Sequence, residues 1–408
     1  MKFSKICIIL LLLIISIGAV SATEVDNSTV GITQDNQYMN SESDYTFTNL
    51  TNEIDISGGT LDIQHDYKFN NESDAGYITI DKNDFTINGN GFTIDGNKQS
   101  GIFNITGTNV TINDLVIINC KSDRGIIDST GEITLNNVTF ILNNVTFISD
   151  HTKYVGGAIS NRGGKINCYG SKFIDNHAES GAAIFIENGE LNVCNTYITS
   201  SISNRYGQVW ARYSTVNIDN VDFINISAMY SPAISLEYCS DTIITNSSFI
   251  NLTADMSAGA ISLKRQGNLY IKGCDFINTK SSKNAGALIA DYILADNINV
   301  TILDSLFYNA SSLYGGAFIQ LSGNLVLNNT RFINNKATYG GGALYLSYVN
   351  SEINGCTFDS NVVEELEDNP CCGGAWYFDC ADLVIRDSQF TNNSASLGNA
   401  IYLCDSNY

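Results

Sequence analysis

The chain has 408 residues, of which 44% are hydrophobic, and its formal net charge is −21. This charge argues against nucleic acid as a partner, because phosphate binding needs Lys and Arg. It has 34 glycines but only 2 prolines, which favours uninterrupted strand ladders, because proline lacks the backbone donor that a ladder uses.

The first 22 residues are typical of an export signal. Lys2 and Lys5 precede an apolar run at 6–17, and small residues at 20–22 suit cleavage. This run is short for a membrane span, which needs about 20 residues; an uncleaved anchor is the alternative. No later segment is apolar enough to cross a bilayer. The sequence therefore predicts a secreted or cell-surface, extracellular protein whose mature chain has no transmembrane span.

Residues 23–44 are polar and are expected to form a flexible leader. The stretch YTFTNLTNEIDIS (45–57) has the pattern of a short amphipathic segment that covers the start of the next domain. We expect an N-terminal cap near 45–64, and a single domain over 45–408.

From residue 158 onward a small residue recurs about every 26 residues, with insertions near 291–299 and 364–372. The residue after each small one is always large and apolar, and we expect all of these to point inward, including Trp210 and Trp376. The small residues are Ala158, Ala183, Val209, Ala233, Ala260, Ala287, Ala317, Ala343, Ala375 and Ala400.

A second landmark, mostly phenylalanine, keeps step with the first: Phe173, Tyr197, Phe223, Phe249, Phe276, Phe307, Phe332, Phe358 and Phe390. Three places earlier stand residues that tolerate left-handed backbone angles and predict a tight bend: Asn220, Asn246, Gly273, Asp304, Asn329, Gly355 and Asp387. A polar column follows the landmark, and we expect its amides to pair along the stack: Asn225, Asn251, Asn278, Asn309, Asn334 and Asn392.

Short strands with period-two alternation, joined by bends, indicate an all-β fold. The regular columns predict a single-stranded parallel β-helix, a solenoid in which each circuit of about 26 residues adds one rung. The apolar spacing excludes helical repeats. A β-sandwich is the structural alternative, but it would not need such regular columns.

The repeat resembles that of polymorphic outer-membrane proteins, whose marks are Gly-Gly-Ala-Ile and Phe-x-x-Asn. Here these marks stand at 156–159 with 173–176 and, with Leu344 in place of the isoleucine, at 341–344 with 358–361. The stretches DFTINGNGFTIDGN (84–97) and GIFNITGTNVTINDLVI (101–117) look like the opening of adhesin-like proteins of methanogenic archaea. Together the matches cover most of 45–408. The resemblance implies an exported, right-handed parallel β-helix displayed at or beyond the cell surface.

Catalytic chemistry has little support in the sequence. Pectin-cleaving hydrolases of this fold carry Asn-Thr-Asp, Asp-Asp, Gly-His-Gly and Arg-Ile-Lys signatures, and none is present. His65, His151 and His177 lack metal-ligand spacing. The acidic run at 364–368 is first a solvated insertion, with a weak calcium site as the alternative. We therefore predict no catalytic residue, no metal and no cofactor.

The cysteines are interpreted as structural residues. Cys168 falls in an inward column, where a thiol acts as a small apolar group. Cys380 and Cys404 take nearly matching places on neighbouring rungs and could form a disulfide.

Tyrosines gather toward the C-terminal end of an outward column. Tyr345, Tyr377 and Tyr402 follow one another in it, and Tyr314 and Tyr339 precede the glycine corner. Exposed aromatics on a rigid sheet could stack on sugars or grip a protein. The alternative is mutual stacking that stabilises the ladder.

These observations favour a non-catalytic, adhesin-like protein that is displayed at the cell surface. Its expected partners are cell-surface glycans or surface proteins of other cells, and the open end of the solenoid could associate end to end with another copy. A carbohydrate-active enzyme on the same fold, a polysaccharide lyase or glycoside hydrolase, is the first alternative. A passive surface-coat component is the second.

Overall fold

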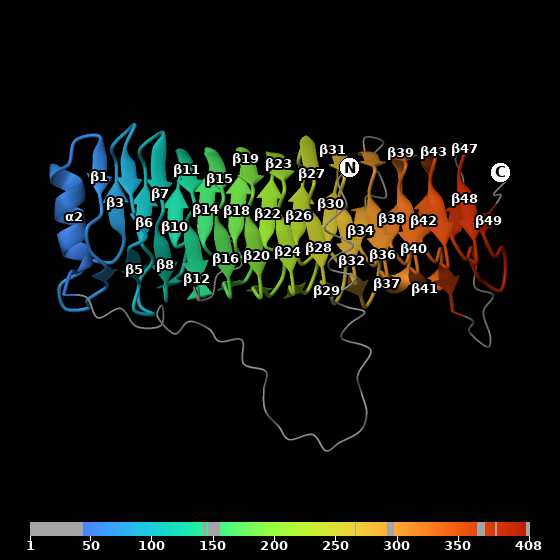
Figure 1. Ribbon diagram of the computed structural model, residues 1–408, viewed down its shortest axis with the longest axis horizontal. Helices are drawn as coiled ribbons and strands as arrows, with labels where there is room; N and C mark the ends of the chain where they lie inside the picture. The colour runs from blue at the N-terminus through green and yellow to red at the C-terminus, as the bar shows by residue number, and fades with distance from the viewer. Residues whose placement is uncertain are drawn as a thin grey trace, which may run out of the picture. The chain divides into compact units, whose positions relative to one another are not determined.

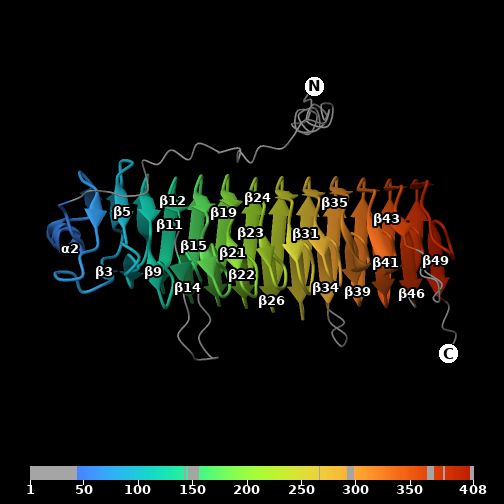
Figure 2. The same cartoon turned by 90° about the horizontal axis from the view of Figure 1, so that it is seen from below.

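The computed structural model describes residues 44–141, 144–145, 156–265, 267–291, 298–364, 372–379 and 382–404. In these residues a helix is followed by short strands that stack into four parallel sheets, called A to D here (Figures 1 and 2). The chain passes through sheets C, A, B and D in each complete circuit and then returns to sheet C. This is the all-β, single-stranded parallel β-helix that the repeat predicts.

Left-handed bends divide each circuit into its strands. In one circuit the bends are Asn188 (φ 56°), Asn195 (φ 52°) and Ser200 (φ 51°). Asn tolerates this conformation because its short polar side chain bonds locally. The bends separate four strands, which are β18 (Ile184–Glu187), β19 (Glu190–Cys194), β20 (Tyr197–Thr199) and β21 (Ile202–Ser203).

Sheet A has the longest strands, and Cys168 lies there as predicted, in register with Leu135 and Val193 and fully buried. Its strands, besides β19, are β1 (Thr60–Asp62), β4 (Thr86–Asn88), β7 (Val110–Asn113), β11 (Glu132–Asn136), β15 (Lys165–Tyr169), β23 (Thr215–Asp219), β27 (Asp241–Thr245), β31 (Gly267–Lys272), β35 (Ile298–Leu303), β39 (Gly323–Asn328), β43 (Val349–Asn354) and β47 (Leu383–Arg386).

Sheet B carries the phenylalanine landmark, whose rings stack inside the solenoid. From Phe223 to Phe390, neighbouring ring centroids lie 4.5–5.1 Å apart with interplanar angles of 2–9°. The strands, besides β20, are β2 (Tyr67–Lys68), β5 (Thr93–Asp95), β8 (Val116–Ile118), β12 (Thr139–Ile141), β16 (Lys172–Ile174), β24 (Asp222–Ile224), β28 (Ser248–Ile250), β32 (Asp275–Ile277), β36 (Leu306–Tyr308), β40 (Arg331–Ile333), β44 (Thr357–Asp359) and β48 (Gln389–Thr391).

Sheet C follows the glycine corner. Besides β18, its strands are β3 (Ile78–Ile80), β6 (Phe103–Ile105), β10 (Ile127–Ser129), β14 (Ile159–Arg162), β22 (Val209–Arg212), β26 (Ile234–Glu237), β30 (Ile261–Lys264), β34 (Leu288–Asp291), β38 (Phe318–Gln320), β42 (Leu344–Ser347), β46 (Trp376–Asp379) and β49 (Ile401–Cys404).

Sheet D precedes that corner and has the shortest strands. Besides β21, they are β9 (Lys121–Ser122), β13 (Asn144–Val145), β17 (His177–Ala178), β25 (Ser227–Ala228), β29 (Thr253–Ala254), β33 (Lys280–Ser281), β37 (Ser311–Tyr314), β41 (Lys336–Gly340) and β45 (Val362–Val363).

Two sequence predictions in one stretch of the chain are wrong by one residue. Val209, not Trp210, pairs with Ile184 and faces the interior, so Trp210 lies on the outer side of sheet C. Likewise Ile198, not Tyr197, pairs with Phe173 in the phenylalanine column.

The displacement of Trp210 has a local cause. Gln208 occupies the position that Ala183 and Ala233 hold in the neighbouring circuits. Because Gln208 is not small, an alignment on small residues matches Val209 instead and is shifted by one residue. Trp376, by contrast, points inward as predicted and packs edge-on against Phe358 and Phe390.

The outer side of sheet C is itself covered. The segment between sheets D and C folds back over it: a Cβ added to Gly315 would lie 2.6 Å from the Ile319 side chain, and Tyr206 stacks on Trp210 with 4.7 Å between ring centroids. Trp210 is therefore only 1% exposed although it points away from the core. Sheet C is consequently buried on both faces over much of its length.

The predicted bends are confirmed, and the predicted amide ladder is confirmed from Asn225 to Asn309, whereas Asn392 donates to the Asp359 carboxylate instead. The bend column has φ of 47–64°, and the polar column after the phenylalanines has φ of 53–55°. Asn278 donates its amide to Asn251 at 3.0 Å and accepts from Asn309 at 2.8 Å. From Asn225 to Asn309 the later rung donates to the earlier one, whereas in the neighbouring column Asn335 donates to Asn361 and Asn361 donates to Asn393.

Substitutions at Asn278 can separate the stability contributed by the ladder hydrogen bonds from the cost of the left-handed backbone angle. Asn278→Gly removes two side-chain hydrogen bonds and should cost about 1–2 kcal/mol. Asn278→Ala should cost about 1 kcal/mol more, because a Cβ is disfavoured in the left-handed region. Thermal and denaturant unfolding measure both changes, and equal losses would contradict the assignment.

The N-terminal end is covered by helix α2 (Phe47–Ile56), which lies across the first rung (Figure 1). Phe47, Leu50 and Ile54 are buried against the solenoid core. At the start of the helix the Asp74 carboxylate accepts from the backbone N–H groups of Phe47 (3.1 Å) and Thr48 (2.8 Å).

The C-terminal end of α2 meets a cation. The Lys82 ammonium donates to the carbonyl oxygens of Ser57 at 2.7 Å and Asp55 at 3.1 Å. Both charges have the sign that the helix dipole favours at their end. The first full rung therefore clamps the helix at both termini.

Asp74 should make this clamp sensitive to acid. Burial raises its pKa, but hydrogen bonds from Asn70, Thr48 and Phe47 outweigh burial and hold the pKa below its ordinary value. A carboxyl group whose pKa is lower in the folded protein than in the unfolded chain stabilises the fold at pH values above its unfolded pKa. This contribution is lost as the pH falls through the folded pKa.

We expect Asp74→Ala to destabilise α2 by about 1–2 kcal/mol at neutral pH. Hydrogen exchange of the α2 amides measures this. The difference between wild type and variant should vanish in strong acid, and a difference that persists there would contradict the role of the carboxylate.

Some predictions fall outside the described residues. These are the export signal at 1–22 and the leader except for its last residue. No helix in the part of the chain that the structure describes is long and apolar enough to span a membrane.

Candidate functional site

The outer side of sheet C carries two groups of side chains that could meet a ligand. One is the predicted set of five tyrosines near the C-terminal end, called the tyrosine cluster here: Tyr314, Tyr339, Tyr345, Tyr377 and Tyr402. The other is a charged cluster on the earlier rungs, which consists of Tyr77, Arg124, Asp128, Ser160 and Arg162.

The fold brings the five predicted tyrosines together. Tyr345, Tyr377 and Tyr402 pair in register on β42, β46 and β49. Tyr314 is the last residue of β37, and Tyr339 is the last but one of β41, both in sheet D. The Tyr314 ring packs edge-on against Tyr345 with 5.8 Å between ring centroids. The cluster is thus built by two sheets rather than by one column.

Stacking decides which rings are available. Tyr345 and Tyr377 lie 4.6 Å apart at 5°, and Tyr377 and Tyr402 lie 5.7 Å apart at 23°. Their faces therefore contact each other, as the alternative of mutual stacking predicts. Tyr314 and Tyr339 are tilted by 35° and are 39% and 41% exposed. These two rings are the most exposed of the cluster.

The stacked phenols remain hydrogen-bond donors. Burial raises the pKa of Tyr345, with the nearby Asp379 carboxylate adding to it. Burial, followed by Tyr345 and Cys404, raises the pKa of Tyr377 strongly. Both hydroxyls therefore keep their protons at neutral and moderately alkaline pH.

A second aromatic group lies midway along the same side. Trp210 packs on Phe185 with 5.0 Å between ring centroids, and Tyr206 stacks between Trp210 and Tyr230. The Lys264 ammonium lies 4.8 Å from the Tyr230 ring centroid. Sequence reasoning missed this group because it placed Trp210 in the core.

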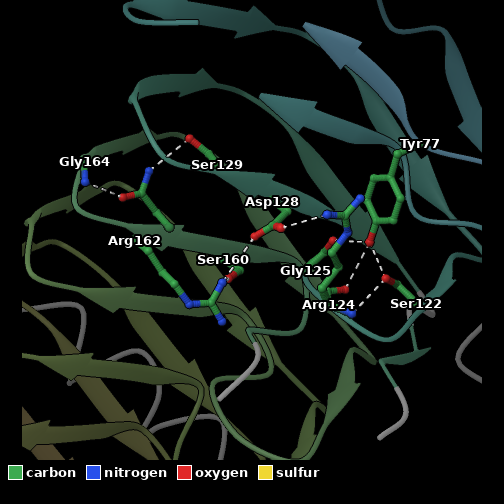
Figure 3. Close-up of polar contacts among 10 residues, drawn as sticks. Tyr77, Ser122, Arg124, Gly125, Asp128, Ser129, Ser160, Arg162 and Gly164 are labelled. Atoms are coloured by element: carbon green, nitrogen blue, oxygen red, sulfur yellow. Dashed lines mark hydrogen bonds and ion pairs between the residues drawn. The ribbon is translucent and has the colours of Figure 1, made fainter. Parts of the chain in front are cut away.

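The charged cluster converges on Asp128, an outward residue of β10 (Figure 3). Arg124 and Arg162 approach its carboxylate from opposite sides, with N–O distances of 3.5 and 3.6 Å. Ser160 stands beside Asp128 on the next rung, 3.4 Å from the Arg162 guanidinium. Asp128 is 16% exposed, whereas Arg124 and Arg162 are 42% and 40% exposed.

Aromatic rings hold both arginines. The Arg124 guanidinium lies 4.2 Å from the Tyr77 ring centroid, and that of Arg162 lies 5.5 Å from the Phe185 ring centroid. Such cation–π contacts favour a guanidinium placed over a ring face. Tyr77 is fixed in turn, because its hydroxyl contacts Ser122 and lies 2.6 Å from the Gly125 carbonyl oxygen (Figure 3).

Opposite effects act on the pKa of Asp128, and burial is the largest of them. Burial raises the pKa of this carboxyl above its ordinary value, while Arg162 and Arg124 oppose the rise and Asp123 adds to it. No motif marks this site in the sequence. The available signal was a carboxylate in the outward column of a covered strand, with an arginine four residues before it.

Tyr77 can lie over the next rung only because Gly101 has no side chain. A Cβ at Gly101 would sit 2.3 Å from the ring. Gly101→Ala should therefore displace Tyr77 and cost about 1–3 kcal/mol, as overpacking does.

Gly58→Ala is the control for Gly101→Ala, since no atom of the described residues lies within 4 Å of a Cβ at Gly58. Thermal unfolding of the two variants measures the difference. A Gly101→Ala protein as stable as Gly58→Ala would contradict the packing.

The remaining predicted residues are placed as follows. Cys404 has a free thiol and lies level with Asp379, while Cys380 lies outside the described residues, so their disulfide stays a prediction. His65 stacks on Tyr45, and His151 is not among the described residues. In the part of the chain that is described, no group of three or more His, Cys, Asp or Glu side chains could hold a metal ion.

A model of the right-handed β-helix region matches residues 182–358 and 254–408, which together make up more than half of the chain. The chain therefore belongs to this family of right-handed parallel β-helices. The handedness that the resemblance implied is thus confirmed.

One curated protein is related in sequence over part of the chain. Metabotropic glutamate receptor-like protein R of Dictyostelium discoideum is 36% identical over 105 residues, which are 26% of this chain. The chain spans only 6% of the length of that relative.

Solved structures are similar to the chain at low identity. A PL6 alginate lyase in complex with a trisaccharide is 14% identical, with 85% of this chain and 81% of the other covered and a TM-score of 0.44. The catalytic unit of an α-1,3-glucanase from Streptomyces thermodiastaticus is 10% identical, with 90% and 69% covered and a TM-score of 0.34. Similarity at this level carries no argument about activity.

Proposed function

We propose that this protein is an adhesin-like β-helix that is exported, displayed at the cell surface, and binds glycans or surface proteins of other cells without catalysis. One observation carries the proposal. The five tyrosines of the tyrosine cluster form one continuous aromatic surface, in which Tyr314 and Tyr339 are 39% and 41% exposed.

The stacking refines what this surface can contact. Rings whose faces are covered by neighbours offer edges and hydroxyl groups, whereas Tyr314 and Tyr339 offer more of their surface. A sugar ring is apolar on one face and polar at its rim, so a tilted tyrosine beside a row of phenol donors suits it. Stacking along β42, β46 and β49 holds this surface rigid, which lowers the entropy lost on binding.

The sequence resemblance supports the same role. The Gly-Gly-Ala-Ile and Phe-x-x-Asn marks and the opening at 84–117 resemble those of surface-displayed proteins. We propose the export signal at 1–22 and the relationships to archaeal adhesin-like and outer-membrane proteins together with this function.

The proposal predicts saturable binding of the purified protein to one or more members of a glycan array or to intact cells. Tyr314→Ser with Tyr339→Ser should weaken that binding by at least about tenfold, because each accessible ring supplies roughly 1 kcal/mol or more. Tyr169→Ser on the outer side of sheet A is the matched control, since Tyr169 is similarly exposed at 40%.

Unfolding temperatures of both variants separate lost binding from lost structure. A passive coat component would show no saturable binding to any glycan or cell. If the Tyr169→Ser control weakened binding as much as the Tyr314→Ser, Tyr339→Ser double variant, the tyrosine cluster would not be the binding surface.

A carbohydrate-active enzyme is the second candidate, and one observation favours it. Asp128 is a carboxyl of raised pKa beside two arginines and a partly buried tyrosine, the kind of setting in which proton transfer occurs. Release of reducing ends or unsaturated products from a polysaccharide panel, lost in Asp128→Asn, would establish this function in place of the adhesin.

A further inference from the structure

The two arginines of the charged cluster are held differently from Arg212 of sheet C. Arg212 is held between Glu187 at 2.8 Å and Glu237 at 3.0 Å and is mostly buried. Arg124 and Arg162 instead share one carboxylate, at 3.5 and 3.6 Å. Both distances exceed the roughly 2.7–2.9 Å of a short charge-assisted bond.

The charged cluster presents its arginines, rather than its carboxylate, to solvent. The shared Asp128 carboxylate is the more buried partner, and the two guanidiniums are the more exposed ones. The side that meets solvent is therefore cationic, in a chain whose formal net charge is −21. Stacking on Tyr77 and Phe185 orients both guanidiniums before any ligand arrives.

We propose that Arg124 and Arg162 form a binding site for a single carboxylate of an acidic sugar residue, on the same side of sheet C as the tyrosine cluster. Guanidinium groups match the planar geometry of a carboxylate. Ser160 is fully buried beside Asp128, so the two guanidiniums are the groups that would contact the ligand. The inference rests on the proposed glycan binding for its ligand class.

The surrounding charges select a sparsely charged ligand. Asp128 and nearby Asp123 offset the two arginines, and the chain as a whole is strongly acidic. A dense polyanion would be repelled at long range. One carboxylate among neutral sugars would be held by direct contact, so its binding should depend only weakly on salt.

The test compares an oligosaccharide that contains one glucuronate with the matched neutral oligosaccharide that contains glucose, using isothermal titration calorimetry. The acidic ligand should bind wild-type protein at least about tenfold more tightly, because a hydrogen bond to a charged group is stronger than a neutral one. Arg124→Gln and Arg162→Gln should each remove most of this preference. Lys172→Gln, an exposed cation on sheet B, should leave it unchanged.

Asp128→Asn supplies a test that a purely structural role would fail. It removes the charge that competes for both guanidiniums and keeps the side-chain shape. The preference for the acidic ligand should therefore increase, whereas loss of an ion-pair network alone would lower stability without raising affinity.

The outcomes separate this inference from the proposed function. Equal binding of both ligands, or a preference that survives both arginine changes, overturns the carboxylate site and leaves the adhesin in place. Glucuronate binding that needs the arginines but not Tyr314 and Tyr339 supports the site even if the tyrosine cluster binds nothing. Tighter binding of a highly sulfated oligosaccharide than of the glucuronate ligand contradicts the single-carboxylate assignment.

Discussion

The structure depends on one constraint, which is that successive circuits pair as parallel strands in register. Parallel pairing sets neighbouring rungs about 4.8 Å apart, so a residue type that suits one rung must suit the next. The phenylalanine stack from Phe223 to Phe390 meets this constraint with face-to-face rings. The asparagine columns meet it with aligned amides. Insertions do not disturb the register, because they fall between strands.

The same constraint makes sheet C a platform for binding. Covering segments bury much of its outer side, and the side chains that remain accessible there are held by neighbouring side chains. Arg124 lies on Tyr77, Arg162 lies by Phe185, and Tyr314 lies against Tyr345. Contacts of this kind fix side-chain angles, which makes the surface rigid.

The two clusters share this construction and differ in chemistry. The tyrosine cluster offers neutral donors and ring surfaces, whereas the charged cluster offers guanidiniums beside a buried carboxylate. Because both lie along the outer side of sheet C, a long glycan that ran parallel to the solenoid axis could contact either or both. The rungs between them carry the Trp210 group, which gives that side aromatic character between the clusters.

The sequence by itself determined the parallel solenoid, its period, its left-handed bends and the outward column of Tyr345, Tyr377 and Tyr402, because each depends on repetition that a single chain displays. The tertiary structure decided the rest. One glutamine in place of an alanine hid the register of Trp210, since a one-residue shift exchanges the two faces of a strand. The charged cluster was equally hidden, because Tyr77, Arg124 and Arg162 lie on three different circuits and only stacking brings them to one carboxylate.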